Sequence, residues 1–128
     1  MDYKTQLELD DDAAYANWGA AWRMPTDAEW TELINNCTWS RTIQIGVNGY
    51  KITSKSNGNS IFLPVAGYCD TKLREADNDG WYWSSSHGTD SSPHEASCIL
   101  FNLNIAGSNA RHGNCYRSYG LSIRPVCP

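Results

Sequence analysis

The spacing of hydrophobic residues predicts two helices near the start of the chain. The segment 13–18 follows three aspartates and precedes Gly19, a pattern typical of a short helix with a carboxylate cap at its N-terminus. The segment 27–36 carries apolar residues at helical spacing. Thr26 precedes it, and Glu29 follows Thr26 by three positions, as in a capping box. We therefore expect helices at these two ranges.

Past the second helix, the hydrophobic period changes to that of strands. The ranges 42–47 and 50–53 flank Asn48-Gly49, a pair that favours a two-residue hairpin turn. A polar turn follows, and then the apolar run that opens at Ser60 should end as a strand near Pro64, because proline cannot donate to a sheet ladder. This part of the chain predicts a hairpin and a third strand.

The rest of the chain alternates polar stretches with short apolar runs. The pattern predicts a loop over 70–80, an aromatic strand that enters a serine-rich turn over 81–86, a strand over 98–101 and a closing edge strand over 121–127. From strand alternation we expect Trp83 in the core and Trp81 on the surface. Trp18, Trp22 and Trp30 lie on or beside the helices and are expected in the core.

Composition and charge narrow the class of protein. A chain of 128 residues with 41% hydrophobic and 19% charged residues is typical of one folded domain over 1–128, here of the α+β class. No long apolar run occurs, so we expect no membrane insertion. The net charge is −4 and there is no basic run, so we expect no nucleic-acid partner.

Three segments carry a family resemblance. They are 17–30 (NWGAAWRMPTDAEW), 80–86 (GWYWSSS) and 117–126 (RSYGLSIRPV), in this order. Together they resemble the Fibrobacter succinogenes major paralogous domain, which is common in Bacteroidetes and related to formylglycine-generating-enzyme-like domains. The resemblance implies a C-type lectin-like fold, with two helices packed on small antiparallel sheets and a loop-rich C-terminal half. Residues 1–80 would form the scaffold and residues 81–128 the display loops and closing strand.

The resemblance also implies a function. Relatives of this family look like the variable proteins of diversity-generating retroelements, whose C-terminal half binds a ligand. We therefore expect a non-enzymatic module, extracellular, on a cell surface or on a phage particle, that binds a protein or glycan on another cell or surface. The candidate binding residues are Trp81, Tyr82, His87, Asp90, His94, Ser108, Asn109, Arg111, His112, Asn114, Tyr116, Tyr119 and Leu121.

Five cysteines make some disulfide use plausible. In C-type lectin-like domains a disulfide between a helix end and the final strand recurs, so the resemblance implies that Cys37 pairs with Cys127. Cys98 and Cys115 leave two alternatives open. They could bridge neighbouring strands, or they could occur by chance in a variable surface.

Catalytic and metal-dependent alternatives have less support. Formylglycine-generating enzymes bind copper through two closely spaced C-terminal cysteines, and this chain has only Cys115 near that place. The spacing of His87, His94, His112 and Cys115 matches no common ligand pattern, and the range 77–80 is expected to be a solvated turn instead of a calcium loop. We expect no enzyme, cofactor or metal. An oxidase of that type and a fixed-sequence adhesion or envelope domain are the alternatives.

Overall fold

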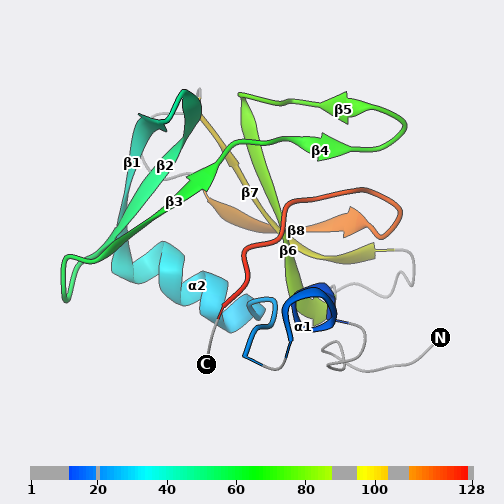
Figure 1. Ribbon diagram of the computed structural model, residues 1–128, viewed down its shortest axis with the longest axis horizontal. Coiled ribbons are helices and arrows are strands. Elements are labelled where there is room, and N and C mark those ends of the chain that lie inside the picture. The colour runs from blue at the N-terminus through cyan, green and yellow to red at the C-terminus, as the bar shows by residue number, and fades with distance from the viewer. Residues whose placement is uncertain (1–11, 20, 88–94, 104–109, 127–128) are drawn as a thin grey trace.

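A computed structural model describes residues 12–19, 21–87, 95–103 and 110–126, which form two helices and three small antiparallel sheets (Figure 1). The elements are α1 (Ala13–Trp18), α2 (Asp27–Asn36), β1 (Cys37–Gln44), β2 (Val47–Ser54), β3 (Ser60–Pro64), β4 (Tyr68–Cys69), β5 (Leu73–Arg74), β6 (Asp79–His87), β7 (Glu95–Asn102) and β8 (Arg111–Tyr116). The α+β class is confirmed. Within these described ranges, no helix is long and apolar enough to cross a membrane.

The helix α1 is confirmed at its predicted bounds, and a buried carboxylate begins it. Asp12 Oδ1 accepts hydrogen bonds from the backbone N–H groups of Ala14 at 2.9 Å and Tyr15 at 3.2 Å. The same carboxylate accepts from Met24 N at 2.9 Å, so it joins α1 to the segment that leads into α2. Asp12 is only 3% exposed, and these three donors offset the cost of burying its charge.

The helix α2 is also confirmed at its predicted bounds, and its capping box is complete. Thr26 Oγ1 accepts from Glu29 N at 3.2 Å, and Glu29 Oε1 accepts from Thr26 N at 2.9 Å. Arg23 donates to both carboxylate oxygens of Glu29, at 2.5 and 2.7 Å. The hydrogen bond from Arg23 is the main reason that the pKa of Glu29 falls to about 2.

The first sheet has the order β1-β2-β3, and its hairpin turn is not where the sequence predicts it. The turn is Ile45-Gly46, with φ of 50° and 76°, whereas Asn48 and Gly49 lie inside β2. Gly49 is a glycine for another reason. A Cβ there would lie 2.4 Å from the carbonyl oxygen of Leu63, because β3 passes close to it. The third strand, β3, begins and ends as predicted.

The second three-stranded sheet has the order β6-β7-β8, and we call it the second sheet. It makes the C-terminal half more regular than the sequence predicts. The strand β6 continues through the serines that were predicted to form a turn. Ser85 N and Ser84 Oγ both donate to the carbonyl oxygen of Pro25, at 2.8 and 3.3 Å. These contacts hold the serine stretch extended against the start of α2, and small side chains allow the close approach. The predicted strand over 98–101 is confirmed within β7.

The closing segment is not a continuous strand, contrary to the prediction for 121–127. It makes isolated bridges instead. Ser122 pairs in parallel with Tyr82 on the free edge of β6, and Val126 pairs antiparallel with Arg23. Pro125 stands between these two bridges and cannot donate to a ladder, which explains the interruption. Residue 127 lies outside the described residues.

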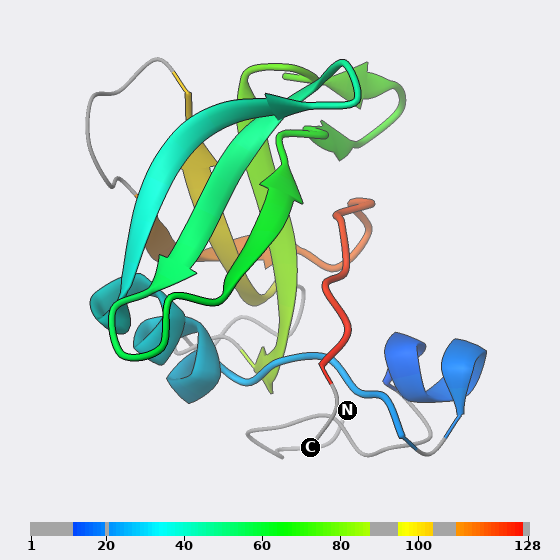
Figure 2. The same ribbon diagram turned by 60° about the vertical axis from the view of Figure 1, so that its left-hand side comes forward.

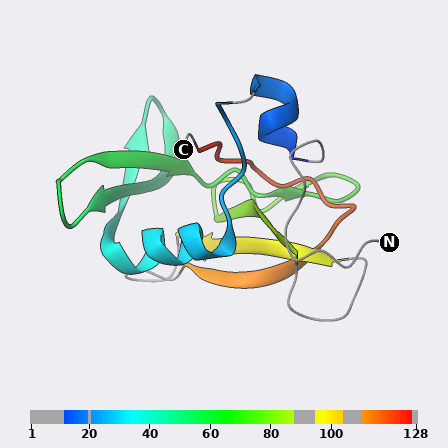
Figure 3. The ribbon, with the colours of Figure 1, turned by 90° about the horizontal axis from the view of Figure 1, so that it is seen from below.

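The hydrophobic core lies between the two three-stranded sheets and is closed by α2 (Figures 2 and 3). Phe101 of β7 is at its centre and contacts the rings of Trp39, Tyr50 and Tyr82, at centroid distances of 5.3, 5.5 and 5.8 Å. Trp30 of α2, 1% exposed, packs on Tyr82 and is in the core as predicted.

Four aromatic residues do not lie where the sequence predicts them: Tyr82, Trp83, Trp18 and Trp22. Tyr82 was predicted at the binding surface, but it is only 2% exposed, and its hydroxyl donates to Pro64 O at 2.8 Å. Burial raises the pKa of that hydroxyl. Trp81 and Trp83 both lie half-buried on the opposite side of β6, because residues two apart on a strand share a face. Trp18 and Trp22 were expected in the core but are 56% and 40% exposed.

Replacement of Gly49 by alanine tests the register of the first sheet. Because the added methyl would collide with the β3 backbone, we expect Gly49→Ala to lower the free energy of unfolding by about 1–3 kcal/mol. Gly120→Ala is the control, since its methyl would meet Cys69 Cβ at an ordinary 3.4 Å. Urea unfolding followed by circular dichroism measures both. Equal stability of Gly49→Ala and the parent chain would contradict this register.

The Arg23–Glu29 pair gives a pH-dependent contribution to stability. The pKa of Glu29 lies below its usual 4.5, so the contribution is complete above about pH 4.5 and is lost as pH falls towards 2. The Glu29 side chain is 37% exposed, so solvent screens the pair. We expect Glu29→Gln to cost about 1 kcal/mol at pH 7 and progressively less towards pH 2.

Glu32→Gln is the matched control, because Glu32 is an exposed glutamate on the same helix. It should change the free energy of unfolding by less than about 0.5 kcal/mol at every pH. A penalty for Glu29→Gln that does not depend on pH would exclude the charge of Glu29 as its cause. Thermal unfolding across the pH series measures both variants.

Candidate binding site

Four aromatic rings form one continuous group that includes Trp81, on the face of β6 turned away from the core. We call this group the aromatic patch; it consists of Tyr68, Trp81, Tyr116 and Tyr119. Tyr68 contacts Trp81 at a centroid distance of 4.5 Å and stacks on Tyr119 at 5.4 Å. Tyr116 meets Tyr119 edge to face at 5.4 Å and is 52% exposed, while the other three rings are half-buried. The sequence placed three of these residues in a binding surface and missed Tyr68.

Backbone hydrogen bonds between distant segments bring the patch together. Cys69 N donates to Gly120 O and Gly120 N donates to Cys69 O, both at 2.7 Å, which joins β4 to the segment after β8. Ser122 N donates to Trp81 O at 3.0 Å and holds that segment against β6. Tyr119 N donates to Tyr116 O at 3.0 Å in a turn that places their two rings together. Backbone hydrogen bonds, in addition to the ring contacts, therefore hold the segments that carry the four rings in place.

The position of Tyr68 depends on Gly67, which no sequence pattern identifies. Gly67 has a φ of 72°, and a Cβ there would lie 2.0 Å from the carbonyl oxygen of Arg74 on β5. Only glycine allows this close approach of β4 to β5 at a left-handed backbone conformation. No local pattern around Tyr68 could have shown that it reaches Trp81, since β4 is only two residues long.

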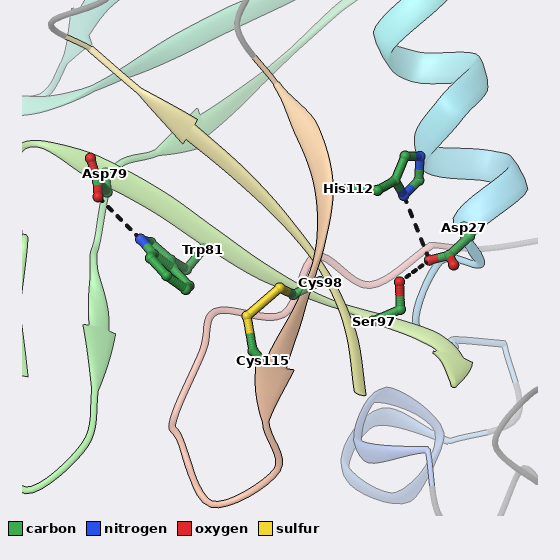
Figure 4. The surroundings of a disulfide bond; sticks show 7 residues. All are labelled: Asp27, Asp79, Trp81, Ser97, Cys98, His112 and Cys115. Atoms are coloured by element: carbon green, nitrogen blue, oxygen red, sulfur yellow. Dashed lines mark hydrogen bonds and ion pairs between the residues drawn. A yellow bond between two sulfur atoms is a disulfide. The ribbon is translucent and has the colours of Figure 1, made fainter. Parts of the chain in front are cut away.

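A disulfide between Cys98 and Cys115 links β7 to β8 (Figure 4). Cys98 and Cys115 lie on the same face as Trp81 and are 0% and 4% exposed. Their Cα atoms are 6.2 Å apart, within the range that a disulfide spans. This decides between the two alternatives left open for these cysteines, because they are bonded. Cys115 directly precedes Tyr116, so the bond anchors one end of the patch.

The disulfide predicted between Cys37 and Cys127 is wrong, because Cys37 is a free thiol. Cys37 begins β1 opposite Ser54, in the first sheet. The closing segment instead reaches Arg23 through the Val126 bridge. Cys127 itself lies outside the described residues.

Polar groups border the patch at Trp81. Asp79 accepts from Trp81 Nε1 at 3.3 Å (Figure 4). It also accepts from the side-chain amide of Asn102. Arg111 is exposed on the same face, across β7 from Trp81. The described residues contain no group of three or more histidine, cysteine, aspartate or glutamate side chains that could hold a metal ion.

His112 and Asn114 lie on the other face of β8, away from the patch. His112 Nε2 is 2.7 Å from Thr31 Oγ1, and its Nδ1 is 3.9 Å from Asp27 Oδ1 on α2. Ser97 Oγ donates to the same Asp27 oxygen at 2.6 Å (Figure 4). The carboxylate thus lies between the hydroxyl and the imidazole, whereas activation of a serine needs the imidazole beside the hydroxyl. These contacts fasten α2 to the second sheet.

The remaining predicted binding residues contribute less to the described site. Leu121 is half-buried between the bridge of Gly120 to Cys69 and the bridge of Ser122 to Tyr82, and His87 is the last residue of β6. Asp90, His94, Ser108 and Asn109 lie outside the described residues.

A small pocket opens on the same side of β6 as the patch. It has a volume of about 260 Å³. Its lining residues include Trp83, Ser84, Arg117 and Ile123. The pocket is mostly apolar, although Ser84 and Arg117 are polar residues of its lining.

No known family model, curated protein or solved structure matches the chain.

Removal of the disulfide should destabilise the fold and loosen the patch. We expect Cys98→Ala with Cys115→Ala to lower the free energy of unfolding by about 2–4 kcal/mol, because the bond closes a short loop. Cys69→Ala is the control, since Cys69 is an exposed free thiol. Peptide mapping without reductant should recover Cys98 and Cys115 in one linked species. Recovery of both as free thiols from oxidised protein would contradict the assignment.

Proposed function

We propose that this protein is a non-enzymatic binding module of the C-type lectin-like type, and that the aromatic patch is its contact surface for a protein or glycan ligand. The observation that carries the proposal is that three aromatic residues from the C-terminal half, Trp81, Tyr116 and Tyr119, join Tyr68 in one partly exposed group. Three of these four residues lie in the display half that the family resemblance implies, and Tyr68 lies in the scaffold half.

The construction of the patch suits recognition. Tyrosine and tryptophan give a large contact area at a small entropic cost, because each has only two side-chain torsions. Here the rings also contact one another and backbone hydrogen bonds join the segments that carry them, so little further order is needed on binding. Tyrosine hydroxyls and the Arg111 guanidinium supply hydrogen bonds at the border of the surface.

The oxidase alternative loses its one candidate ligand. Copper binding of that type needs the thiolate of Cys115, and the sulfur of Cys115 is bonded to Cys98. No observation specifically favours the fixed-sequence adhesion or envelope domain over the binding module.

The proposal includes diversification of the display half by a retroelement. Burial limits which positions could vary without loss of the fold, since Tyr82 and Phe101 are in the core while Arg111 and Tyr116 are exposed. We expect the DNA of the locus to hold a near-copy of the region encoding 82–125 that differs only at adenines, beside a reverse-transcriptase gene. A near-copy with differences mainly in codons of core residues would contradict this, and no near-copy would favour a fixed-sequence domain.

Binding can be tested by screening the full chain against a printed glycan array and a phage-displayed peptide library. For a ligand found in either screen, we expect Tyr116→Ala and Tyr119→Ala each to weaken the Kd about tenfold, in line with the loss of an aromatic anchor. Trp18→Ala is the matched control, because Trp18 is an exposed aromatic residue on α1, outside the patch. It should leave the Kd within about twofold.

Circular dichroism and thermal unfolding would show whether the patch variants keep the fold. Ligands whose affinity is unchanged by both tyrosine variants, with Trp18→Ala weakened instead, would place the binding surface elsewhere. A folded chain that retains no ligand in either screen would contradict the binding proposal itself.

A further inference from the structure

The tip of the β1–β2 hairpin exposes three aliphatic side chains to solvent. We call Ile43, Ile45 and Val47 the aliphatic tip; they are 65%, 103% and 44% exposed. In Figure 2 the hairpin turn lies at the upper edge of the molecule, away from the core. Single exposed aliphatic residues are common on protein surfaces, but three at one projecting turn form a group that needs an explanation.

Ile45 occupies a backbone conformation that disfavours it. Its φ is 50°, and that of Gly46 is 76°, as in a two-residue turn with both central residues in the left-handed region. Asparagine and glycine suit the first of these positions, whereas a β-branched residue is strained there. Because Ile45 is fully exposed, core packing does not compensate for this strain. Stability of the fold therefore gives no reason for an isoleucine at this position.

The aliphatic tip presents apolar groups on every side. Ile43 pairs with Asn48, and Val47 pairs with Gln44, so Ile43 and Val47 lie on opposite faces of the hairpin with Ile45 at its apex. A groove on a protein would cover one face of such a hairpin. The interfacial layer of a lipid bilayer would surround all three side chains at once.

The strands behind the tip carry positive charge. Arg41 lies on β1 and Lys51 on β2, whereas Lys55 follows Ser54 at the opposite end of the hairpin. These three are the only charged residues between positions 33 and 69, in a chain whose net charge is −4. All three are exposed, and none of them forms an ion pair within the described part of the chain. Arg41 stands two residues from Ile43 on the same face, about 7 Å along the strand. Apolar groups in an interface reach about 5–10 Å below the level where cations meet lipid headgroups.

We propose that the aliphatic tip inserts into the interfacial layer of an anionic lipid bilayer, with Arg41 and Lys51 at the headgroups. The contact is peripheral and reversible, because three aliphatic side chains provide only a small apolar area. It differs from a membrane-spanning segment, which would need a long apolar run. Aliphatic residues that alternate with polar ones make no long run, and a turn placed at Asn48-Gly49 would not bring them to one apex. The inference does not depend on the function of the aromatic patch.

Vesicle flotation tests the inference directly. The full chain is mixed with vesicles of phosphatidylglycerol and phosphatidylcholine in equal parts, or of phosphatidylcholine alone. We expect flotation with the anionic vesicles, less with the neutral ones, and loss of the difference at high salt, where surface charges are screened. Ile45→Asn should reduce the floated fraction roughly fivefold or more, because it removes the apex side chain.

The design separates loss of binding from loss of fold. Asparagine is the better turn residue, so Ile45→Asn should unfold at a higher temperature than the parent chain while it binds vesicles less. Leu73→Asn is the matched control, since Leu73 is an aliphatic residue on β5, outside the tip, and is 63% exposed. Its flotation should equal that of the parent chain. Arg41→Gln with Lys51→Gln should remove the preference for anionic vesicles and leave flotation with neutral ones unchanged.

Two outcomes would overturn the proposal. Equal flotation of Ile45→Asn and the parent chain would show that the tip does not enter the bilayer. Failure of the parent chain to float with anionic vesicles would exclude a lipid surface. The partner to be sought would then be a protein with an apolar pocket that receives the tip.

Discussion

The Phe101 ring packs between the two three-stranded sheets, and the position of the aromatic patch depends on it. Phe101 packs against Trp39 and Tyr50 from the first sheet and stacks on Tyr82 from β6. Gly80 makes room for it, since a Cβ there would lie 2.2 Å from the ring. With Gly80 and Tyr82 turned towards Phe101, strand alternation turns the intervening Trp81 to the opposite face. The core contact therefore determines which aromatic residue of β6 is available to a ligand.

The aromatic patch then needs segments that are distant in the sequence. Cys69 and Gly120 exchange two backbone hydrogen bonds, and the closing segment pairs with the edge of β6 that β7 leaves free. The disulfide between Cys98 and Cys115 lies on the same outer face and fixes the end of β8. Because these cross-links are made by backbone and by a covalent bond, the patch side chains could change with little effect on the frame that supports them.

The parts of the fold that local sequence determines were predictable. Helix α2 begins with Thr26 and Glu29, which satisfy each other's backbone within one turn, so the capping pattern alone locates it. The hairpin turn was not predictable in this way. Asn48-Gly49 has the local signature of a turn, but Gly49 is required by the approach of β3, from a residue more than a dozen positions away. In Ile45-Gly46 only the glycine matches the usual turn pair. These two residues form the turn because the sheet register pairs Gln44 with Val47.

The candidate site shows the same division between local and distant causes. Composition and resemblance led to Trp81, Tyr116 and Tyr119, but they also led to Tyr82, whose burial depends on Phe101 in another strand. Tyr68 was missed because only its contacts with β6 and the closing segment place it in the patch. The pairing of Cys98 with Cys115 follows from strand register, which a list of cysteine spacings does not contain.

Nuclear Overhauser contacts between ring protons test most directly whether packing on Phe101 buries Tyr82 and turns Trp81 outward. We expect contacts from the Phe101 ring to the Tyr82 ring and to the Gly80 α-protons, and from the Trp81 ring to Tyr68. Contacts from the Trp81 ring to Phe101 and Trp39, with the Tyr82 ring free of core contacts, would contradict it.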